Sequence, residues 1–349
     1  MRPDILVLGA GGVLGEAWLT GMLAGVEDGS GLDLRGCEYF LGTSAGALVA
    51  ARLAAGERLR RPSRTPDPGS GPARPDPGQL VAVGTRQVPR RPPSIAAVTR
   101  SAIGLAERTV NAATGWGLSV ALGASAPVLP AGLALAAPGG AVARAAALRM
   151  LPRPAGEFTE LRSELDGLAA RFDGRLRIVA VARASGRRIV FGRPGAPRAT
   201  VADAVQASCA VPWLVAPIRI GVVEYVDGGF WSPTNLDVAP AARDTQVLCL
   251  SPTAATPFAA SRTPAWGSAL AAMWPPKSPL SDPDRLTPVA RRLSRAVTLV
   301  EATSLRGRRA QVGLVAPDDE TAAVIGGDLM DAARVEEILS AGYQQGLRL

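Results

Sequence analysis

The sequence predicts an α/β fold with a mainly parallel central sheet, and two observations carry this prediction. Short, largely apolar runs recur along the chain, as expected for strands that are buried on both faces of a parallel sheet; they are Ile5–Leu8, Leu176–Ala182 and Gln246–Leu250. The first run also opens an order of strand, glycine-rich loop, helix, strand, tight turn and helix. Strands that alternate with helices in this way form parallel sheets, so we expect the first two strands to be neighbours.

The glycine-rich loop after the first strand covers residues 9–15. A helix is predicted over residues 16–27, because apolar side chains recur on one side of it; they are Trp18, Leu19, Met22, Leu23 and Val26. A second apolar run ends at Leu41, and residues 45–55 are almost purely helix-forming. The chain must therefore turn sharply between a strand and a helix near residue 44.

Ser44 stands at the centre of that turn, in the sequence Gly-Thr-Ser-Ala-Gly from Gly42 to Gly46. Small residues on both sides allow a nucleophile elbow, a turn that exposes a serine hydroxyl at the carboxyl edge of a sheet. The five residues alone are weak evidence in a chain with 39 glycines. The strand before them and the helix after them carry the prediction that Ser44 is a nucleophile.

The chain contains no histidine. A Ser-His-Asp triad and a histidine-ligated zinc site are therefore excluded. A serine nucleophile in this chain needs a carboxylate or an amine as its base.

Asp227 is the candidate base, because it follows the largely apolar run 222–226 and precedes two glycines that would let it turn into a site. The alternative for Asp227 is an ordinary Asp-Gly turn between strands. Gly11 and Gly12 are candidates for an oxyanion hole, since glycines let the backbone approach a ligand and their N–H groups lie at the start of a helix. Neighbouring parallel strands would bring this loop and Ser44 to one edge of the sheet.

A dinucleotide-binding loop is the competing interpretation of the glycine-rich loop. Its Gly-x-Gly-x-x-Gly pattern, started from Gly9, needs a glycine at position 14, where this chain has Leu14. No acidic residue is suitably placed at the end of the second strand, which runs straight into the turn at Ser44. The sequence therefore disfavours a dinucleotide site.

Residues 56–156 are predicted to be an insertion in a single domain that spans residues 1–349. Up to about residue 100 the insertion is rich in proline, glycine and arginine, which favours an exposed and partly disordered segment. Residues 109–143 carry no charge but are broken by prolines, so a membrane-spanning helix is not expected. Two interpretations of this apolar stretch stay open: a helical hairpin that faces the core, or a cap over the site that can meet a lipid surface.

The remaining elements follow from hydrophobic periodicity and turn residues. We expect helices over residues 158–172, 200–208, 293–305 and 332–345, and further strands over residues 188–191 and 311–316.

Composition bounds the class of protein. A chain of 349 residues with 47% hydrophobic residues can bury a large core. The three cysteines stand in apolar surroundings, which favours buried, reduced thiols in a cytoplasmic protein; they are Cys37, Cys209 and Cys249. The first residues predict a strand and not a signal peptide.

The net charge of +8 comes almost wholly from arginine, since Lys277 is the only lysine. Two explanations stay open: a bias that replaces lysine by arginine, or an attraction to anionic lipid or nucleic acid. Nucleic-acid binding is disfavoured, because the arginines cluster in a proline-rich stretch without interleaved aromatic residues.

The motifs around these residues resemble those of the patatin-like phospholipases. They are AGGVLG at residues 10–15, GTSAG at 42–46 and DGG at 227–229, and further similar stretches are QASCAVPWLVAPI, DGGFWSPTNLD and GGDLMD at 326–331. The resemblance covers roughly residues 2–55 and residues from 157 onward. It departs at Leu14, where many members have arginine or lysine, and at Ala10, where their loop has its first glycine.

This resemblance implies a three-layer α/β/α fold with an inserted Pro/Arg-rich and apolar helical segment. It also implies a Ser44–Asp227 dyad without histidine and an oxyanion hole at Gly11 and Gly12. We expect no cofactor and no metal, since the sequence has no acidic loop with the spacing of a calcium site. The function that we expect is a serine lipid acyl hydrolase of the phospholipase A or lysophospholipase type, cytoplasmic and in peripheral contact with an anionic membrane surface. The alternatives are a soluble esterase or thioesterase, or a catalytically silent binding protein of this fold. Acyl chain, head group and oligomeric state stay open.

Overall fold

The computed structural model describes residues 2–63, 140–151, 154, 159–212, 214–254 and 283–349. Most of the predicted insertion lies outside the described residues, including residues 64–139 with nearly all of the charge-free stretch. The division of the chain into one domain with an insertion therefore stays a prediction.

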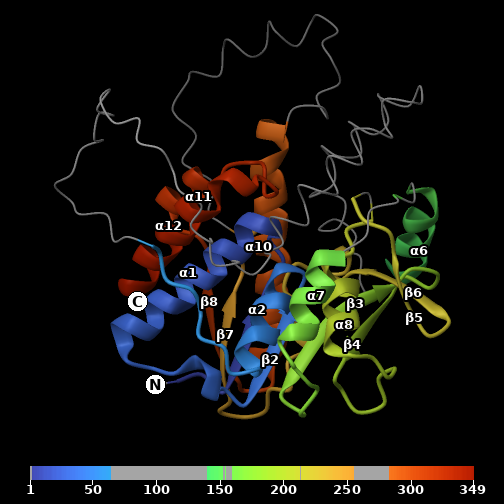
Figure 1. The fold of residues 1–349 in the computed structure, drawn as a ribbon, viewed down its shortest axis with the longest axis horizontal. Helices are drawn as coiled ribbons and strands as arrows, with labels where there is room; N and C mark the ends of the chain where they lie inside the picture. The colour runs from blue at the N-terminus through green and yellow to red at the C-terminus, as the bar shows by residue number, and fades with distance from the viewer. Residues whose placement is uncertain (1, 64–139, 152–153, 155–158, 213, 255–282) are drawn as a thin grey trace, which may run out of the picture.

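The described chain forms one sheet of eight strands, in the order β5-β6-β3-β2-β1-β7-β8, with β4 also paired to β3 (Figure 1). The strands are β1 Ile5–Leu8, β2 Tyr39–Thr43, β3 Leu176–Ala182, β4 Arg187–Phe191, β5 Ile218–Ile220, β6 Val223–Asp227, β7 Gln246–Leu250 and β8 Gln311–Val315. The pairs β3-β2, β2-β1, β1-β7 and β7-β8 are parallel, whereas β4, β5 and β6 pair antiparallel. The predicted mainly parallel sheet is confirmed.

Helices cover both faces of this sheet (Figure 1). They are α1 Gly12–Ser30, α2 Ala45–Ala54, α6 Gly140–Met150, α7 Thr159–Gly167, α8 Val201–Cys209, α10 Pro283–Gly307, α11 Asp319–Ile325 and α12 Val335–Leu347. Short 3₁₀ turns are η1 Leu34–Gly36, η2 Gly228–Phe230, η3 Leu236–Val238 and η5 Ala332–Arg334.

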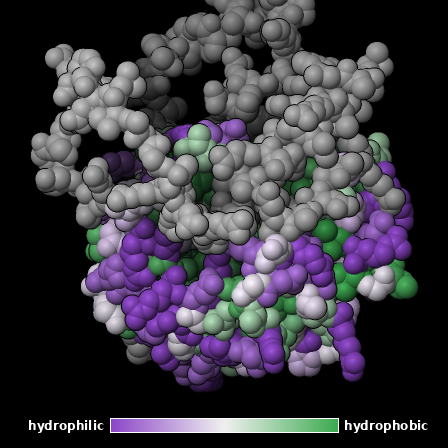
Figure 2. Space-filling view, in the orientation of Figure 1, coloured by the Kyte–Doolittle hydropathy of each residue, from purple (hydrophilic) through white to green (hydrophobic). Residues whose placement is uncertain are grey.

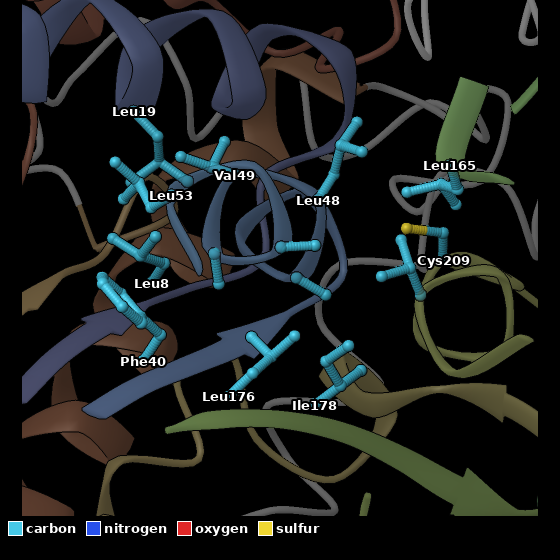
Figure 3. Packing of buried hydrophobic residues seen from close by; sticks show 14 of the residues in the cluster. Leu8, Leu19, Phe40, Leu48, Val49, Leu53, Leu165, Leu176, Ile178 and Cys209 are labelled. Atoms are coloured by element: carbon cyan, nitrogen blue, oxygen red, sulfur yellow. The ribbon is translucent and has the colours of Figure 1, made fainter. Parts of the chain in front are cut away.

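Alternation along the strands divides the core into two sides, because successive side chains of a strand point to opposite faces. Leu6 and Leu8 belong to the cluster that contains buried residues of α1, α2, α8 and α12. Figure 3 shows part of this packing, with Leu48 and Val49 of α2 above the sheet. The intervening Ile5 belongs to a second cluster, which contains residues of α10. A sheet between two helical layers is the predicted three-layer arrangement.

Several predicted element boundaries were wrong. Helix α1 begins at Gly12 and not at residue 16, so the end of the glycine-rich loop is itself helical. Helix α7 ends at Gly167 instead of 172, since Ala169 adopts a left-handed conformation with φ of 50°. Helix α10 starts ten residues earlier than expected, with Pro283 at its first position, where proline is well tolerated. The last predicted helix is split into η5 and α12.

All three cysteines are buried and unpaired, as predicted. Burial raises the pKa of Cys37 to about 12 and raises the pKa values of Cys209 and Cys249 as well. None of the helices in the described ranges is long and apolar enough to cross a membrane.

Candidate active site

Ser44 occupies the turn between β2 and α2 with φ of 53° and ψ of −122°. A positive φ is strained for a residue with a side chain. The flanking glycines make the turn sterically feasible: a Cβ on Gly42 would lie 2.5 Å from the Cα of Ala47, and a Cβ on Gly46 would collide with the carbonyl of Leu8. The sequence therefore forms the strand, tight turn and helix that were predicted around Ser44.

Asp227 lies next to Ser44 across strand β3. In the sheet register Thr43 pairs with Val179 and Asp227 pairs with Ala180, so one strand separates the two side chains. Ser44 Oγ donates a hydrogen bond to Asp227 Oδ2 at 2.6 Å. The other carboxylate oxygen, Oδ1, accepts from the backbone N–H of Gly229 at 2.6 Å. The structure thus brings together the predicted nucleophile and the predicted base.

Burial sets the electrostatics of this pair, since Ser44 and Asp227 are each only 6% exposed. Burial raises the pKa of Asp227 to about 7, although its hydrogen bonds from Ser44 and Gly229 act in the opposite direction. A carboxylate with a raised pKa holds a proton more strongly than an ordinary aspartate. It is therefore better suited to take a proton from a serine hydroxyl.

Ser208 supports the strained backbone of Ser44. Its Oγ accepts a hydrogen bond from the Ser44 N–H at 2.9 Å and donates one to the Val179 carbonyl at 2.6 Å. Ser208 is fully buried at the end of α8. Sequence reasoning assigned Ser208 no role, and its only signal was the QASCAVP stretch of the family resemblance.

The glycine-rich loop borders both halves of the pair. A Cβ on Gly46 would lie 2.8 Å from the carbonyl oxygen of Gly9, and a Cβ on Gly229 would lie 3.3 Å from the Cβ of Ala10. Gly11 is the N-cap of α1 and Gly12 its first residue. The first N–H groups of an α-helix have no acceptor within the helix, so they can donate to an anion.

A segment near the carboxyl end of the chain covers this loop. Leu14 N donates a hydrogen bond to the Leu329 carbonyl at 3.0 Å. A Cβ on Gly12 would lie 2.8 Å from Met330 Sδ. The GGDLMD stretch that resembles the family thus lies against the candidate oxyanion loop. Over the ranges that the structure describes, no group of three or more His, Cys, Asp and Glu side chains could hold a metal ion.

One family model matches part of the chain. Residues 119–240 match the family model described as patatin-like phospholipase. The matched range contains Ser208 and Asp227, whereas Ser44 and the glycine-rich loop precede it. No curated protein matches the sequence.

Among solved structures, the chain is similar to VipD from Legionella pneumophila, with a TM-score of 0.40 and 16% sequence identity. That match covers 100% of this chain and 66% of that chain. This chain therefore spans slightly less than two thirds of the length of VipD.

Proposed function

We propose that the chain is a serine lipid acyl hydrolase of the patatin-like phospholipase type, with Ser44 as nucleophile and Asp227 as base; the match of residues 119–240 to that family model supports this proposal. The 2.6 Å hydrogen bond from Ser44 Oγ to Asp227 Oδ2, in a buried pair, carries this proposal. A serine hydroxyl with a base at hydrogen-bond distance is the arrangement that nucleophilic acyl transfer requires.

The reaction proceeds in two halves. Asp227 takes the Ser44 hydroxyl proton while Oγ attacks the ester carbonyl carbon, and the N–H groups of Gly11 and Gly12 stabilise the negative charge on the carbonyl oxygen. The ester bond then breaks, and the alcohol product leaves with the proton from Asp227. In the second half the same carboxylate activates a water that attacks the acyl-serine, which releases the fatty acid and restores the serine hydroxyl.

The lipid surface is proposed to meet the edge of the molecule formed by α6 and the β5–β6 turn. Val142 and Met150 of α6 are 79% and 86% exposed, and Val222 at the turn is 94% exposed. Arg183 joins these elements, since its N–H donates to the Glu224 carbonyl at 2.8 Å and its Nη2 to the Leu148 carbonyl at 3.0 Å.

This edge lies at the carboxyl end of β3. Because β2 is parallel to β3, the turn that holds Ser44 at the end of β2 lies at the same end of the sheet. In Figure 1, α6, β5 and β6 lie on the right of the molecule. On that side Figure 2 shows hydrophobic residues among hydrophilic ones. The exposed arginines Arg149 and Arg187 supply positive charge there, whereas Arg219 pairs with Glu224 at 3.4 Å. Exposed aliphatic side chains with arginines suit an anionic lipid surface.

Labelling with a serine-reactive fluorophosphonate, followed by peptide mass mapping, tests the nucleophile and the base. We expect modification at Ser44 in the wild type, none in Ser44→Ala and a sharp decrease in Asp227→Asn. A folded wild type that is not labelled, even with detergent or vesicles present, would contradict the proposal and favour the catalytically silent binding protein.

Vesicle flotation with and without anionic lipid tests the surface. We expect Val222→Asp and Met150→Asp to reduce binding to anionic vesicles. Val300→Asp is the matched control, because Val300 is 65% exposed on α10, which is neither of the elements that form this edge. An active wild type that ignores vesicles would instead identify a soluble esterase or thioesterase.

A further inference from the structure

Asn235 contacts a chain neighbour of each residue of the pair, Thr43 beside Ser44 and Gly228 beside Asp227. It is fully buried, eight residues after Asp227, and stands in the left-handed region with φ of 50°. Asparagine tolerates this region better than most residues with a side chain.

The Asn235 amide connects the nucleophile turn to the aspartate loop. Its Nδ2 donates to Thr43 Oγ1 at 3.1 Å, to the Ser232 carbonyl at 2.8 Å and, more weakly, to the Gly228 carbonyl at 3.3 Å. Thr43 immediately precedes Ser44, and Gly228 immediately follows Asp227. One side chain therefore links the residue before Ser44 to the residue after Asp227.

Arg188 orients this amide, because its Nη1 donates to Asn235 Oδ1 at 3.2 Å. The NH₂ group must then point toward the two loops. Arg188 is itself held by Asp237, through contacts of 2.6 and 2.7 Å from its two Nη atoms to the carboxylate oxygens.

Helix α10 holds both chain neighbours of Asn235 through one carboxylate oxygen. Glu301 Oε2 accepts from Thr234 Oγ1 at 2.7 Å and from the Leu236 N–H at 2.9 Å. The left-handed conformation of Asn235 is thus maintained by contacts to both of its neighbours. A side chain held in this way can position the groups that it contacts.

We propose that Asn235 is a positioning residue that sets the distance between Ser44 Oγ and Asp227 Oδ2. This inference rests on the proposed function for its effect on the rate, because Asn235 acts through Thr43 and Gly228. Loss of the link replaces neither reacting side chain, but it leaves their relative position less firmly fixed. A misplacement of about 1 Å in such a pair can reduce the rate on the order of 10²-fold.

Two variants break the link without altering the pair. Thr43→Val removes the hydroxyl that accepts from Asn235 and keeps the β-branched shape, whereas Thr43→Ser retains the hydroxyl. Asn235→Gly removes the amide and tolerates the positive φ. Thr298→Val is the matched control, because Thr298 is a buried threonine of α10 whose Oγ1 donates only to the Ser294 carbonyl among the described contacts.

The measurements are the rate of fluorophosphonate labelling at Ser44, kcat and KM for an ester substrate, the melting temperature, and amide exchange of the peptide over residues 41–47. We expect Thr43→Val and Asn235→Gly to lower the labelling rate and kcat about tenfold or more with little change in KM. Thr43→Ser should restore most of the rate. Thr298→Val should lower only the melting temperature.

Wild-type labelling rates for Thr43→Val and Asn235→Gly would overturn the positioning role and leave the proposed function intact. If the wild type itself is not labelled, the proposed function fails, and amide exchange still tests the link. Faster exchange of residues 41–47 in Thr43→Val than in Thr298→Val would support the link, and equal exchange would overturn it.

Discussion

Two buried carboxyl groups, Asp227 at the end of β6 and Glu301 in α10, have pKa values that burial raises to about 7. They are 6% and 8% exposed. For Glu301 the neighbouring negative charge of Asp237 raises the pKa further. By burial and proton affinity alone, the two groups are hardly distinguishable.

Their hydrogen-bond donors differ. Asp227 accepts from the hydroxyl of Ser44, which stands on a strained turn. Glu301 accepts from Thr234 Oγ1 and from the Leu236 N–H, which belong to the segment around Asn235. A raised pKa in a buried carboxyl is therefore insufficient to identify a base in this fold. The hydrogen-bond donor and the backbone conformation of that donor distinguish the base from the other carboxyl group. The predictions below test this distinction.

Replacement of each carboxyl by its amide should have very different effects on the rate. We expect Asp227→Asn to lower kcat about 10²- to 10⁴-fold, because the proton acceptor for Ser44 is lost. Glu301→Gln should change kcat less than about tenfold, since the amide oxygen can still accept from Thr234 and Leu236. Steady-state hydrolysis of an ester substrate by both folded variants measures this. Comparable losses in the two variants would remove the distinction between the two carboxyl groups.

The pH dependence should follow Asp227 alone. Its carboxylate must be ionised to accept a proton, so kcat/KM should rise with pH up to a plateau and fall about tenfold per unit below a midpoint near the pKa of about 7. Glu301→Gln should keep the same midpoint. A midpoint near pH 4 in the wild type, or one that moves in Glu301→Gln, would disagree with this assignment.

Ser208→Ala tests whether the hydrogen bond to the backbone of Ser44 contributes to stability and to the reactivity of Ser44. The variant leaves the buried Ser44 N–H without its acceptor, which costs about 1–3 kcal/mol in the free energy of unfolding. We also expect slower labelling of Ser44, because the turn is less firmly held. Urea unfolding and the labelling rate measure the two effects. Thr298→Val, which also removes a buried hydroxyl, should reduce stability without affecting the labelling rate.

The smallest expected effect concerns stability and pH. A carboxyl whose folded-state pKa is raised contributes stability in its protonated form, present below its unfolded pKa and lost as pH rises through about 7. Glu301→Gln removes this dependence, so its melting temperature relative to the wild type should increase from pH 5 to pH 8. A constant difference between wild type and Glu301→Gln would show that Glu301 does not titrate in this range.

Part of the candidate site was predictable because its chemistry leaves local marks in the sequence. Ser44 was identified by the small residues around it and by the strand and helix on either side. Asp227 was ambiguous, since an Asp-Gly turn has the same local sequence as a base at the end of a strand. Ser208 and Asn235 had no local mark, because each contacts a partner more than 160 residues away.

The sequence by itself determined that any serine chemistry here must proceed without histidine. It also determined the parallel strands and the glycines without which the turn at Ser44 would clash, since hydrophobic runs and steric limits are properties of short segments. Only the tertiary structure decided that Asp227 faces Ser44 and that its pKa is raised. The physical reason is the sheet order, which places β3 between β2 and β6. Burial and hydrogen bonds between distant segments arise only when those strands assemble.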